Sequence, residues 1–298
     1  MAGRALTILR AGSLGSRALP LPVLSTLVQA GAARFGPRLM AGKADQLQRH
    51  LDRVAATRPE AGEPAEAADG IASYARYWVE SFRLPSLDDR DLDRGFSFIG
   101  YGHIEDVVAS GYGPLLVLPH LGGWEWAAAW LGRVSDVEVT AVVERLEPEE
   151  VFDWFEQLRR SYGVNVVPLG PEAAAELAAA VKRRSVVCLL ADRDIGGTGV
   201  EVEFFGERTT VPVGPALLSR RTGAPILPTA VFFRGRQRVT VVGEPIWPDP
   251  ERRPGRAREA ATEVTQTYVR AMEGLIGQAP EQWHLLEPNW PSDHATAG

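Results

Sequence analysis

A histidine and a carboxylate stand close together in the sequence, just after a run of apolar residues. The run Leu-Leu-Val-Leu at 115–118 leads to His120, and Glu125 follows five positions later. A neutral imidazole can take a proton from an alcohol, and a carboxylate on its second ring nitrogen fixes the tautomer and stabilises the imidazolium. We therefore predict that His120 is a general base and that Glu125 orients it.

The residues around this pair must place the two side chains side by side. Residues 115–118 predict a buried strand, residues 124–130 have helical composition, and two glycines between them permit a tight turn. Positions five apart on one helix diverge by about 140°. His120 must therefore precede the helix, with Glu125 in its first turns. The alternative is a histidine that caps the helix and bonds Glu125 for stability alone.

A second charged cluster, Asp192-Arg193-Asp194, follows the apolar run 186–191 and precedes a glycine-rich loop. Sites in open α/β sheets gather at such strand ends. One interpretation is the metal-binding Asp-x-Asp of a sugar-nucleotide glycosyltransferase. Another is that Asp192 supports the His120 site while Arg193 binds an anionic substrate group. A surface cluster of ion pairs is the third interpretation.

Further charged residues follow other predicted elements. Glu144 and Arg145 come at the end of an apolar strand, Arg159 lies on a predicted helix at 149–162, and Arg208 stands in a later turn. Converging arginines suit phosphate recognition, although each of these residues is also compatible with an ordinary solvated charge.

Composition and missing motifs exclude several classes of protein. The chain has 298 residues, 45% of them hydrophobic, which is enough for a large core. The single Cys188 excludes an internal disulfide framework and a cysteine-based zinc site, and we expect it to be a buried apolar residue. No Walker-type phosphate loop or G-x-S-x-G motif occurs. Direct attack by a substrate hydroxyl therefore fits better than a covalent route, and we predict no metal site.

The first 44 residues differ from the rest of the chain. They contain six basic residues and no acidic one, so the net charge of −6 divides into +6 here and −12 elsewhere. Pro20 and Pro22 interrupt the apolar residues, and no run reaches the roughly 20 residues that span a bilayer. We predict that residues 1–44 lie on an anionic membrane surface. The alternatives are a helix packed on the body of the protein or a signal peptide.

The remaining residues, 45–298, predict a single α/β domain. Apolar runs at 115–118, 137–143, 164–167, 186–191, 200–205, 226–233 and 239–242 alternate with helical patterns at 71–84, 124–132, 149–162, 171–184 and 256–276. Such alternation predicts a mixed, largely parallel central sheet with helices on both faces. The acidity of this part argues against general nucleic-acid binding.

Taken together, these blocks resemble those of the actinobacterial phosphatidylinositol mannoside acyltransferases, within the lipid A and glycerolipid acyltransferase superfamily marked by His-x4-Asp/Glu. The matching blocks span about residues 71–290 and run in order. They are Ser73-Tyr74-Ala75-Arg76-Tyr77-Trp78, Phe82-Arg83-Leu84-Pro85, Leu118-Pro119-His120, Trp124-Glu125, Glu144-Arg145-Leu146, Ala191-Asp192-Arg193-Asp194, Phe204-Phe205-Gly206-Glu207, Pro212, Gly214-Pro215-Ala216, Trp283-His284-Leu285-Leu286, Pro288 and Trp290.

The resemblance implies transfer of a palmitoyl-type chain from acyl-CoA, a co-substrate, to a mannose hydroxyl of a phosphatidylinositol mannoside. It implies peripheral attachment to the cytoplasmic face of the plasma membrane and no bound cofactor. By this resemblance His120 is the base, Glu125 its orienting carboxylate, Arg159 a site residue and Asp192 a second acidic site residue. In the wider superfamily Asp often stands in place of Glu125, and a glutamate can stand in place of Asp192.

We therefore expect a sugar-lipid O-acyltransferase without an acyl-enzyme intermediate. Besides the catalytic residues, Arg159, Glu144, Arg145, Arg193, Trp124 and Arg208 are predicted to bind substrates, with oxyanion donors near Gly122, Gly123 or Arg145. Aromatic side chains, namely Tyr74, Trp78, Trp124 and Trp126, are candidate linings of an acyl groove. Three alternatives stay open: an acyltransferase for another glycolipid or a glycerolipid, a metal-dependent glycosyltransferase using Asp192 and Asp194, and a non-enzymatic membrane-binding protein.

Overall fold

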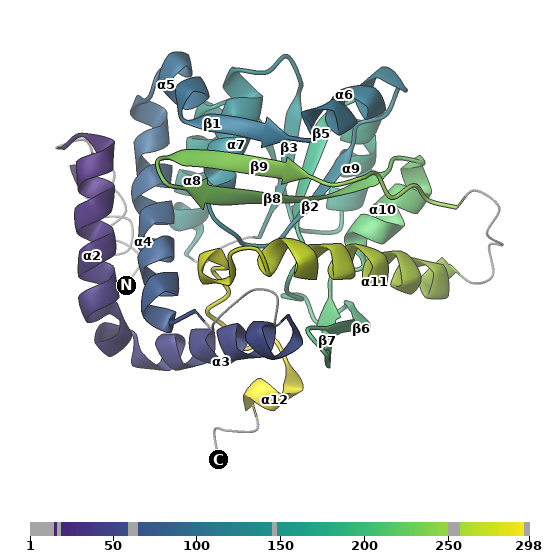
Figure 1. Cartoon of the computed structure of the whole chain (residues 1–298). Helices are drawn as coiled ribbons and strands as arrows, with labels where there is room; N and C mark the ends of the chain where they lie inside the picture. The colour runs from purple at the N-terminus through teal and green to yellow at the C-terminus, as the bar shows by residue number, and fades with distance from the viewer. Residues whose placement is uncertain (1–14, 17–18, 59–64, 145–147, 250–256, 295–298) are drawn as a thin grey trace.

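A seven-stranded sheet with the strand order β1-β9-β8-β2-β5-β3-β4 forms the centre of the molecule (Figure 1). The computed structural model describes residues 15–16, 19–58, 65–144, 148–249 and 257–294. The strands of the sheet are β1 (Phe96–Ile99), β2 (Leu115–Leu118), β3 (Val139–Val143), β4 (Val164–Pro168), β5 (Val186–Leu190), β8 (Ile226–Arg234) and β9 (Gln237–Val242). A separate hairpin consists of β6 (Val200–Phe204) and β7 (Glu207–Val211).

The described helices precede, follow or connect these strands. They are α2 (Leu21–Leu39), α3 (Ala41–Thr57), α4 (Ala67–Arg83), α5 (Asp89–Arg94), α6 (Tyr101–Ala109), α7 (Trp124–Arg133), α8 (Glu149–Ser161), α9 (Ala173–Lys182), α10 (Gly214–Thr222), α11 (Ala257–Ile276) and α12 (Pro291–His294). Short 3-10 turns lie at Leu84–Ser86 and Pro280–Gln282.

Most strands of the sheet run in the same direction. Strands β8, β2, β5, β3 and β4 are parallel to one another, whereas β9 returns antiparallel to β8 and β1 is parallel to β9. The prediction of a mixed, largely parallel sheet flanked by helices is therefore confirmed. Because β2 and its parallel neighbours end at the same edge, the residues that follow them meet there.

Side chains of β2 alternate between two apolar cores. Leu115 and Val117 belong to the core shared with α9, α10 and α11, and Leu116 and Leu118 to the core shared with α5, α6, α7 and α8. All four side chains are buried. A strand that is covered on both faces needs apolar residues at every position, which explains why this run contains no polar residue.

The structure corrects the sequence-based assignment of some elements. The strand predicted at 200–205 is β6, which pairs with β7 alone and lies outside the central sheet. The helix predicted to begin at residue 71 begins at Ala67. Strands β1 and β7 and helices α5, α6 and α10 were not predicted. Strand β1 has only four residues of alternating burial at the sheet edge, which is too short a pattern to identify.

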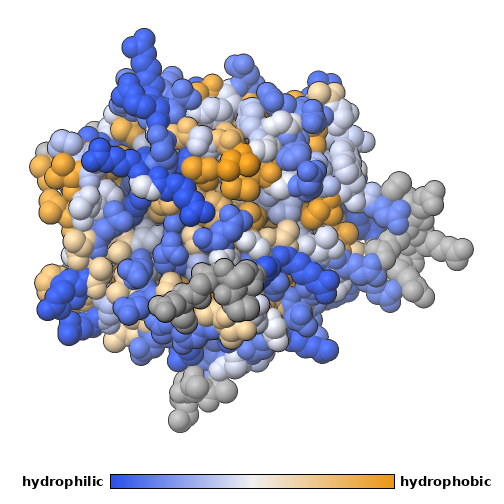
Figure 2. Space-filling view, viewed as in Figure 1, coloured by the Kyte–Doolittle hydropathy of each residue, from blue (hydrophilic) through white to orange (hydrophobic). Residues whose placement is uncertain are grey.

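Helices α2 and α3 pack against α4 (Figure 1). Helix α2 nevertheless leaves large apolar side chains exposed, namely Val23, Leu27, Phe35 and Leu39. They recur every four or eight residues and form a stripe that winds slowly along the helix. Orange side chains at the left edge of Figure 2 lie where Figure 1 places α2. None of the described helices combines the length and the apolarity needed to cross a bilayer.

A buried His–Asp pair holds the C-terminal residues against α3. The Nδ1 atom of His50 lies 3.0 Å from the carbonyl oxygen of Leu285, and its Nε2 atom lies 3.2 Å from Oδ2 of Asp293. Both side chains of the pair are 0% exposed. The same carboxylate oxygen accepts hydrogen bonds from the backbone N–H groups of Asn289 and Trp290, at 2.9 and 3.1 Å. The segment before α12 is thereby fixed to the N-terminal helices.

We predict that Asp293→Asn lowers the free energy of unfolding by about 2 kcal/mol at pH 7, because buried donors lose an ionised acceptor. Burial by itself would raise the pKa of Asp293, but the hydrogen bonds with His50 and the two backbone N–H groups hold it below its ordinary value. A depressed pKa gives stability that is present above the unfolded-state pKa of about 3.9 and is lost as the pH falls towards the folded-state value.

Urea unfolding of wild type and variant at pH 7 and pH 3 measures this effect. The difference in free energy between the two proteins should be smaller at pH 3. An equal difference at both pH values would contradict an ionised Asp293 as the source of the stability.

Candidate active site

Three of the predicted site residues lie where parallel strands end. His120 follows β2, Asp192 follows β5 and Glu144 follows β3, and these strands are neighbours in the order β2-β5-β3. The register pairs Leu118 with Leu190, so the chain leaves β2 and β5 at the same level. His120 and Asp192 are 72 residues apart in sequence and adjacent in space.

The carboxylate of Asp192 binds both the side chain and the backbone of His120. Nδ1 of His120 lies 2.6 Å from Oδ1 of Asp192, and the backbone N–H of His120 donates to Oδ2 at 2.9 Å. The Asp192 side chain is 0% exposed and that of His120 is 25% exposed. The imidazole is therefore held from a buried side while part of its ring remains accessible.

This geometry determines the tautomer of His120. A carboxylate only accepts hydrogen bonds, so the proton of a neutral imidazole sits on Nδ1 and leaves the lone pair of Nε2 free to accept a proton. Burial by itself would raise the pKa of Asp192, but the charge of His120 and the hydrogen bonds that the carboxylate accepts lower it. Asp192 therefore stays ionised, and the pair has the form of a general base with an orienting acid.

A segment near the C-terminus, residues 282–289, crosses this pair, and we call it the C-terminal strap. The indole N–H of Trp283 donates to Oδ2 of Asp192 at 2.8 Å, and the backbone N–H of His284 donates to the carbonyl of His120 at 2.7 Å. The side-chain amide of Asn289 donates to the carbonyl of Asp192 at 3.2 Å. Local patterns around His120 carry no sign of these contacts, because the strap lies more than 150 residues away in sequence.

The turn between β2 and α7 depends on glycine. Gly122 has a φ of +61°, and a Cβ atom there would lie 1.9 Å from the carbonyl oxygen of Val231. The backbone N–H of Gly122 donates to Gln282 at 2.9 Å and that of Gly123 to Val231 at 3.1 Å. The predicted tight turn is confirmed. However, both amide groups already have protein acceptors, so they are not the oxyanion donors that the sequence suggested.

The predicted pairing of His120 with Glu125 is wrong, because Glu125 binds Arg159 and Tyr162 instead. Nε of Arg159 lies 3.1 Å from Oε1 of Glu125, a terminal nitrogen of the same guanidinium also donates to Oε1, and the Tyr162 hydroxyl donates to Oε2. Burial would raise the pKa of Glu125, but the charge and hydrogen bonds of Arg159, with the hydrogen bond of Tyr162, lower it. Glu125 is thus an ionised partner in a buried ion pair.

Helix geometry explains this correction. Trp124 is the first residue of α7, and its ring meets the ring of His120 edge-on at a centroid distance of 5.5 Å. The next helical residue points about 100° away from it, so Glu125 faces α8 and β4 rather than His120. The position facing Nδ1 of His120 is taken by Asp192, as the second interpretation of the Asp-Arg-Asp cluster expected.

A small cavity of about 70 Å³ lies between the sheet and α7. All seven strands of the sheet contribute lining residues, from Phe98 on β1 to Val164 on β4. Trp124, Glu125 and Arg159 border it, and most of its remaining lining is apolar. Trp124, one of the predicted aromatic linings, thus borders this cavity. The other aromatic candidates, Tyr74, Trp78 and Trp126, do not border this cavity.

Cys188 also borders the cavity, but its chemistry is that of an apolar residue. Burial raises the pKa of its thiol to about 12. The thiol therefore stays protonated at neutral pH and is a poor nucleophile, because the thiolate is the reactive form.

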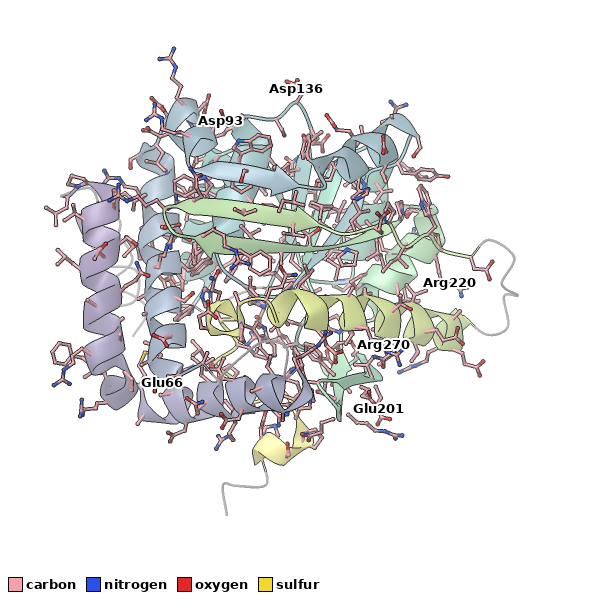
Figure 3. All side chains as sticks on the ribbon, in the orientation of Figure 1. Glu66, Asp93, Asp136, Glu201, Arg220 and Arg270 are labelled. Carbon is pink, nitrogen blue, oxygen red and sulfur yellow. The ribbon has the colours of Figure 1, made fainter. Side chains whose placement is uncertain are left out.

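The structure brings some of the remaining predicted residues together and separates others. Arg193 lies 3.5 Å from Glu144, and both side chains are partly exposed at the edge that carries His120. Arg208 instead pairs with Glu201 on the hairpin, at 3.0 Å, where Glu201 lies at the lower edge of the molecule (Figure 3). It forms no hydrogen bond or ion pair with the other site residues that the structure describes. Arg145 lies outside the described residues.

The two aspartates of the Asp-x-Asp sequence point to different partners. Both oxygens of Asp192 are engaged by His120 and Trp283, and Oδ2 of Asp194 accepts a hydrogen bond from the backbone N–H of Gly199 at 2.8 Å. Within the described ranges, no group of three or more His, Cys, Asp or Glu side chains could hold a metal ion. The arrangement fits proton transfer at His120 better than a metal bridge between the aspartates.

We predict that Glu125→Gln lowers the free energy of unfolding by about 3 kcal/mol, because it leaves the guanidinium of Arg159 buried without its charged partner. Glu156→Gln is the matched control, since Glu156 pairs with the exposed Arg160 on the same helix at 3.0 Å. We expect Glu156→Gln to lower the free energy of unfolding by less than about 0.5 kcal/mol. Urea unfolding of the three proteins measures both effects, and equal stabilities would contradict the structural role of Glu125.

Comparison with known proteins agrees with the resemblance. The model of the bacterial lipid A biosynthesis acyltransferases matches residues 5–292 of the chain. A phosphatidylinositol mannoside acyltransferase of Mycobacterium tuberculosis H37Rv is 37% identical over 288 residues, which cover 95% of this chain and 87% of that protein. The enzyme of the same name from Mycolicibacterium smegmatis is 36% identical over 281 residues, covering 93% and 88%. The chain therefore belongs to the bacterial lipid A biosynthesis acyltransferase family.

Proposed function

We propose that this acyltransferase moves a fatty acyl chain from acyl-CoA to a mannose hydroxyl of a phosphatidylinositol mannoside. The names of its relatives support this acceptor class. The observation that carries the proposal is the His120–Asp192 pair, in which Nε2 of a partly exposed imidazole is available beside an apolar cavity.

In the proposed reaction, Nε2 of His120 takes the proton of the mannose hydroxyl as its oxygen attacks the thioester carbonyl. The new C–O bond forms an ester and the C–S bond breaks. The leaving thiolate of coenzyme A then takes the proton from the imidazolium. Asp192 stabilises the imidazolium between these two transfers. Every proton and electron pair is accounted for without an acyl-enzyme, metal or cofactor.

The cavity beneath α7 is proposed to hold the acyl chain. Its lining is mainly apolar and includes Trp124, whose ring meets the ring of His120 edge-on. Arg159 forms part of its wall. Arg193 and Glu144 stand at the partly exposed edge, where they can contact polar parts of either substrate. Arg145 and Arg208 stay untested as substrate-binding residues.

We further propose that residues 1–44 attach the protein peripherally to an anionic membrane, at the cytoplasmic face of the plasma membrane. Among the described residues of this segment, α2 exposes Val23, Leu27, Phe35 and Leu39 and also carries Arg34 and Arg38. Exposed apolar side chains next to basic ones suit the interface of an anionic bilayer. A lipid acceptor would then be presented from the membrane surface.

The test of the proposed reaction is acyl transfer by the purified protein from radiolabelled palmitoyl-CoA to a panel of lipids. The panel contains a phosphatidylinositol mannoside, phosphatidylinositol, a diacylated glucolipid and lysophosphatidic acid. We expect labelled product with the mannoside, and a loss of kcat of about 10² to 10⁴-fold in His120→Gln and in Asp192→Asn. If only another lipid of the panel were acylated, that lipid would take the place of the phosphatidylinositol mannoside as the proposed acceptor. Undiminished activity of both variants would contradict the assignment of His120 as the base.

Filling the cavity should change the preferred length of the acyl chain. Ala128, on α7, borders the cavity, and we expect Ala128→Phe to reduce kcat/KM for palmitoyl-CoA by about tenfold or more while octanoyl-CoA is used nearly as before. Ala175→Phe, at an exposed position of α9, is the matched control. Equal losses with both donors would show that the chain does not occupy this cavity.

Membrane attachment predicts binding to vesicles that contain phosphatidylglycerol. Leu27→Asp places a charge within the exposed apolar stripe and should reduce co-sedimentation with such vesicles by about tenfold, because it opposes both insertion and charge attraction. Asp45→Asn, at an exposed acidic position of α3, should not reduce binding. Unchanged binding of Leu27→Asp would exclude α2 as the attachment surface.

A further inference from the structure

We infer that Trp283 is a positioning residue, which acts through Asp192 to hold the imidazole of His120 in its reactive orientation. The inference deepens the proposed function and rests on it for the catalytic consequence. Trp283 is 163 residues from His120 in sequence, and its side chain is 0% exposed. It touches no reacting atom, so its effect must pass through the carboxylate that it binds.

The hydrogen bonds of Asp192 divide unequally between its two oxygens. Oδ1 receives the Nδ1–H group of His120 at 2.6 Å. Oδ2 receives the backbone N–H of His120 at 2.9 Å and the indole N–H of Trp283 at 2.8 Å. Rotation of the carboxylate about its Cβ–Cγ bond would break both bonds to Oδ2. The indole thus helps to fix the plane in which Oδ1 meets the imidazole.

The indole itself is held firmly in place. The side-chain amide of Gln282 accepts from the backbone N–H of Phe233 at 2.7 Å and donates to its carbonyl at 3.1 Å. The backbone carbonyl of Gln282 accepts from the N–H of Gly122. Trp283 forms an isolated antiparallel bridge with Leu121. Its indole ring also contacts a group of buried rings, namely His50, Phe204, Phe205 and Trp290. The donor therefore approaches Asp192 from a rigid part of the core.

Removing this donor would leave Oδ2 with the backbone bond alone in a site that water does not reach. A hydrogen bond to a charged group contributes about one to two orders of magnitude to an equilibrium. The carboxylate could then tilt away from Nδ1, and fewer molecules would present Nε2 with its lone pair aimed at the acceptor hydroxyl. Substrate binding would change little, because the indole contacts neither substrate cavity nor exposed edge.

The experiment compares Trp283→Phe with Trp290→Phe. Trp290 is a matched control because it is 1% exposed, lies in the same group of rings, and donates its indole N–H to the carbonyl of Phe204 at 3.1 Å rather than to Asp192. We expect Trp283→Phe to lower kcat about tenfold with each KM within about twofold of wild type. The control should keep wild-type kcat, and the two variants should lose similar stability in urea.

A spectroscopic measurement tests the same inference without turnover. The Nδ1–H proton of His120, in its short bond to Asp192, should give a far-downfield proton resonance that disappears in His120→Gln. Trp283→Phe should shift or broaden this resonance, whereas Trp290→Phe should leave it unchanged. An unshifted resonance together with wild-type kcat in Trp283→Phe would overturn the inference. If the wild type transferred no acyl group to any lipid, the proposed function would fail, and the resonance would still decide whether Trp283 positions the pair.

Discussion

Asp192 carries a negative charge at a fully buried position, and a buried charge is stable only when hydrogen-bond donors surround it. The donors come from two distant parts of the chain, the turn after β2 and the C-terminal strap. Because one of these donors is the imidazole of His120, a single hydrogen bond both stabilises the charge of Asp192 and orients the base. The sheet brings the ends of β2 and β5 to one level, and the strap adds the indole N–H of Trp283 as a further donor to Asp192.

A second buried charge, that of Glu125, is compensated separately. Its partners Arg159 and Tyr162 lie on α8 and at the end of that helix. Breaking such a pair leaves an uncompensated charge, so this contact ties α7 to α8 along the wall of the cavity. Glu125 is close to His120 in sequence and Asp192 is close to it in space, but the two carboxylates have different roles. Asp192 orients the imidazole, and Glu125 links the helices beside the cavity.

The N-terminal and C-terminal segments stabilise the site indirectly. His50 on α3 binds Leu285, which lies within the strap, and Asp293, which follows it. Helix α3 thus reaches Asp192 through a continuous series of hydrogen bonds that passes along the strap. The same N-terminal part exposes apolar side chains on α2. Under the proposed function, the thioester would enter at the partly exposed edge that carries His120, and the exposed face of α2 would meet the bilayer, so the two surfaces lie on different elements.

The sequence by itself predicted most strands of the central sheet and the helices that alternate with them. Apolar runs that must be buried on both faces predicted β2 and β5, and residues at their ends, His120 and Asp192, were expected to share one edge because parallel strands end together. The tight turn was also readable, because glycine readily adopts the left-handed backbone that Gly122 has. Which carboxylate meets the imidazole was decided only by the tertiary structure. A spacing of five residues is compatible with several side-chain directions, and helix α7 turns Glu125 towards α8. The contribution of Trp283 could not be read locally at all, because a hydrogen bond between residues so far apart exists only once the core has packed around them.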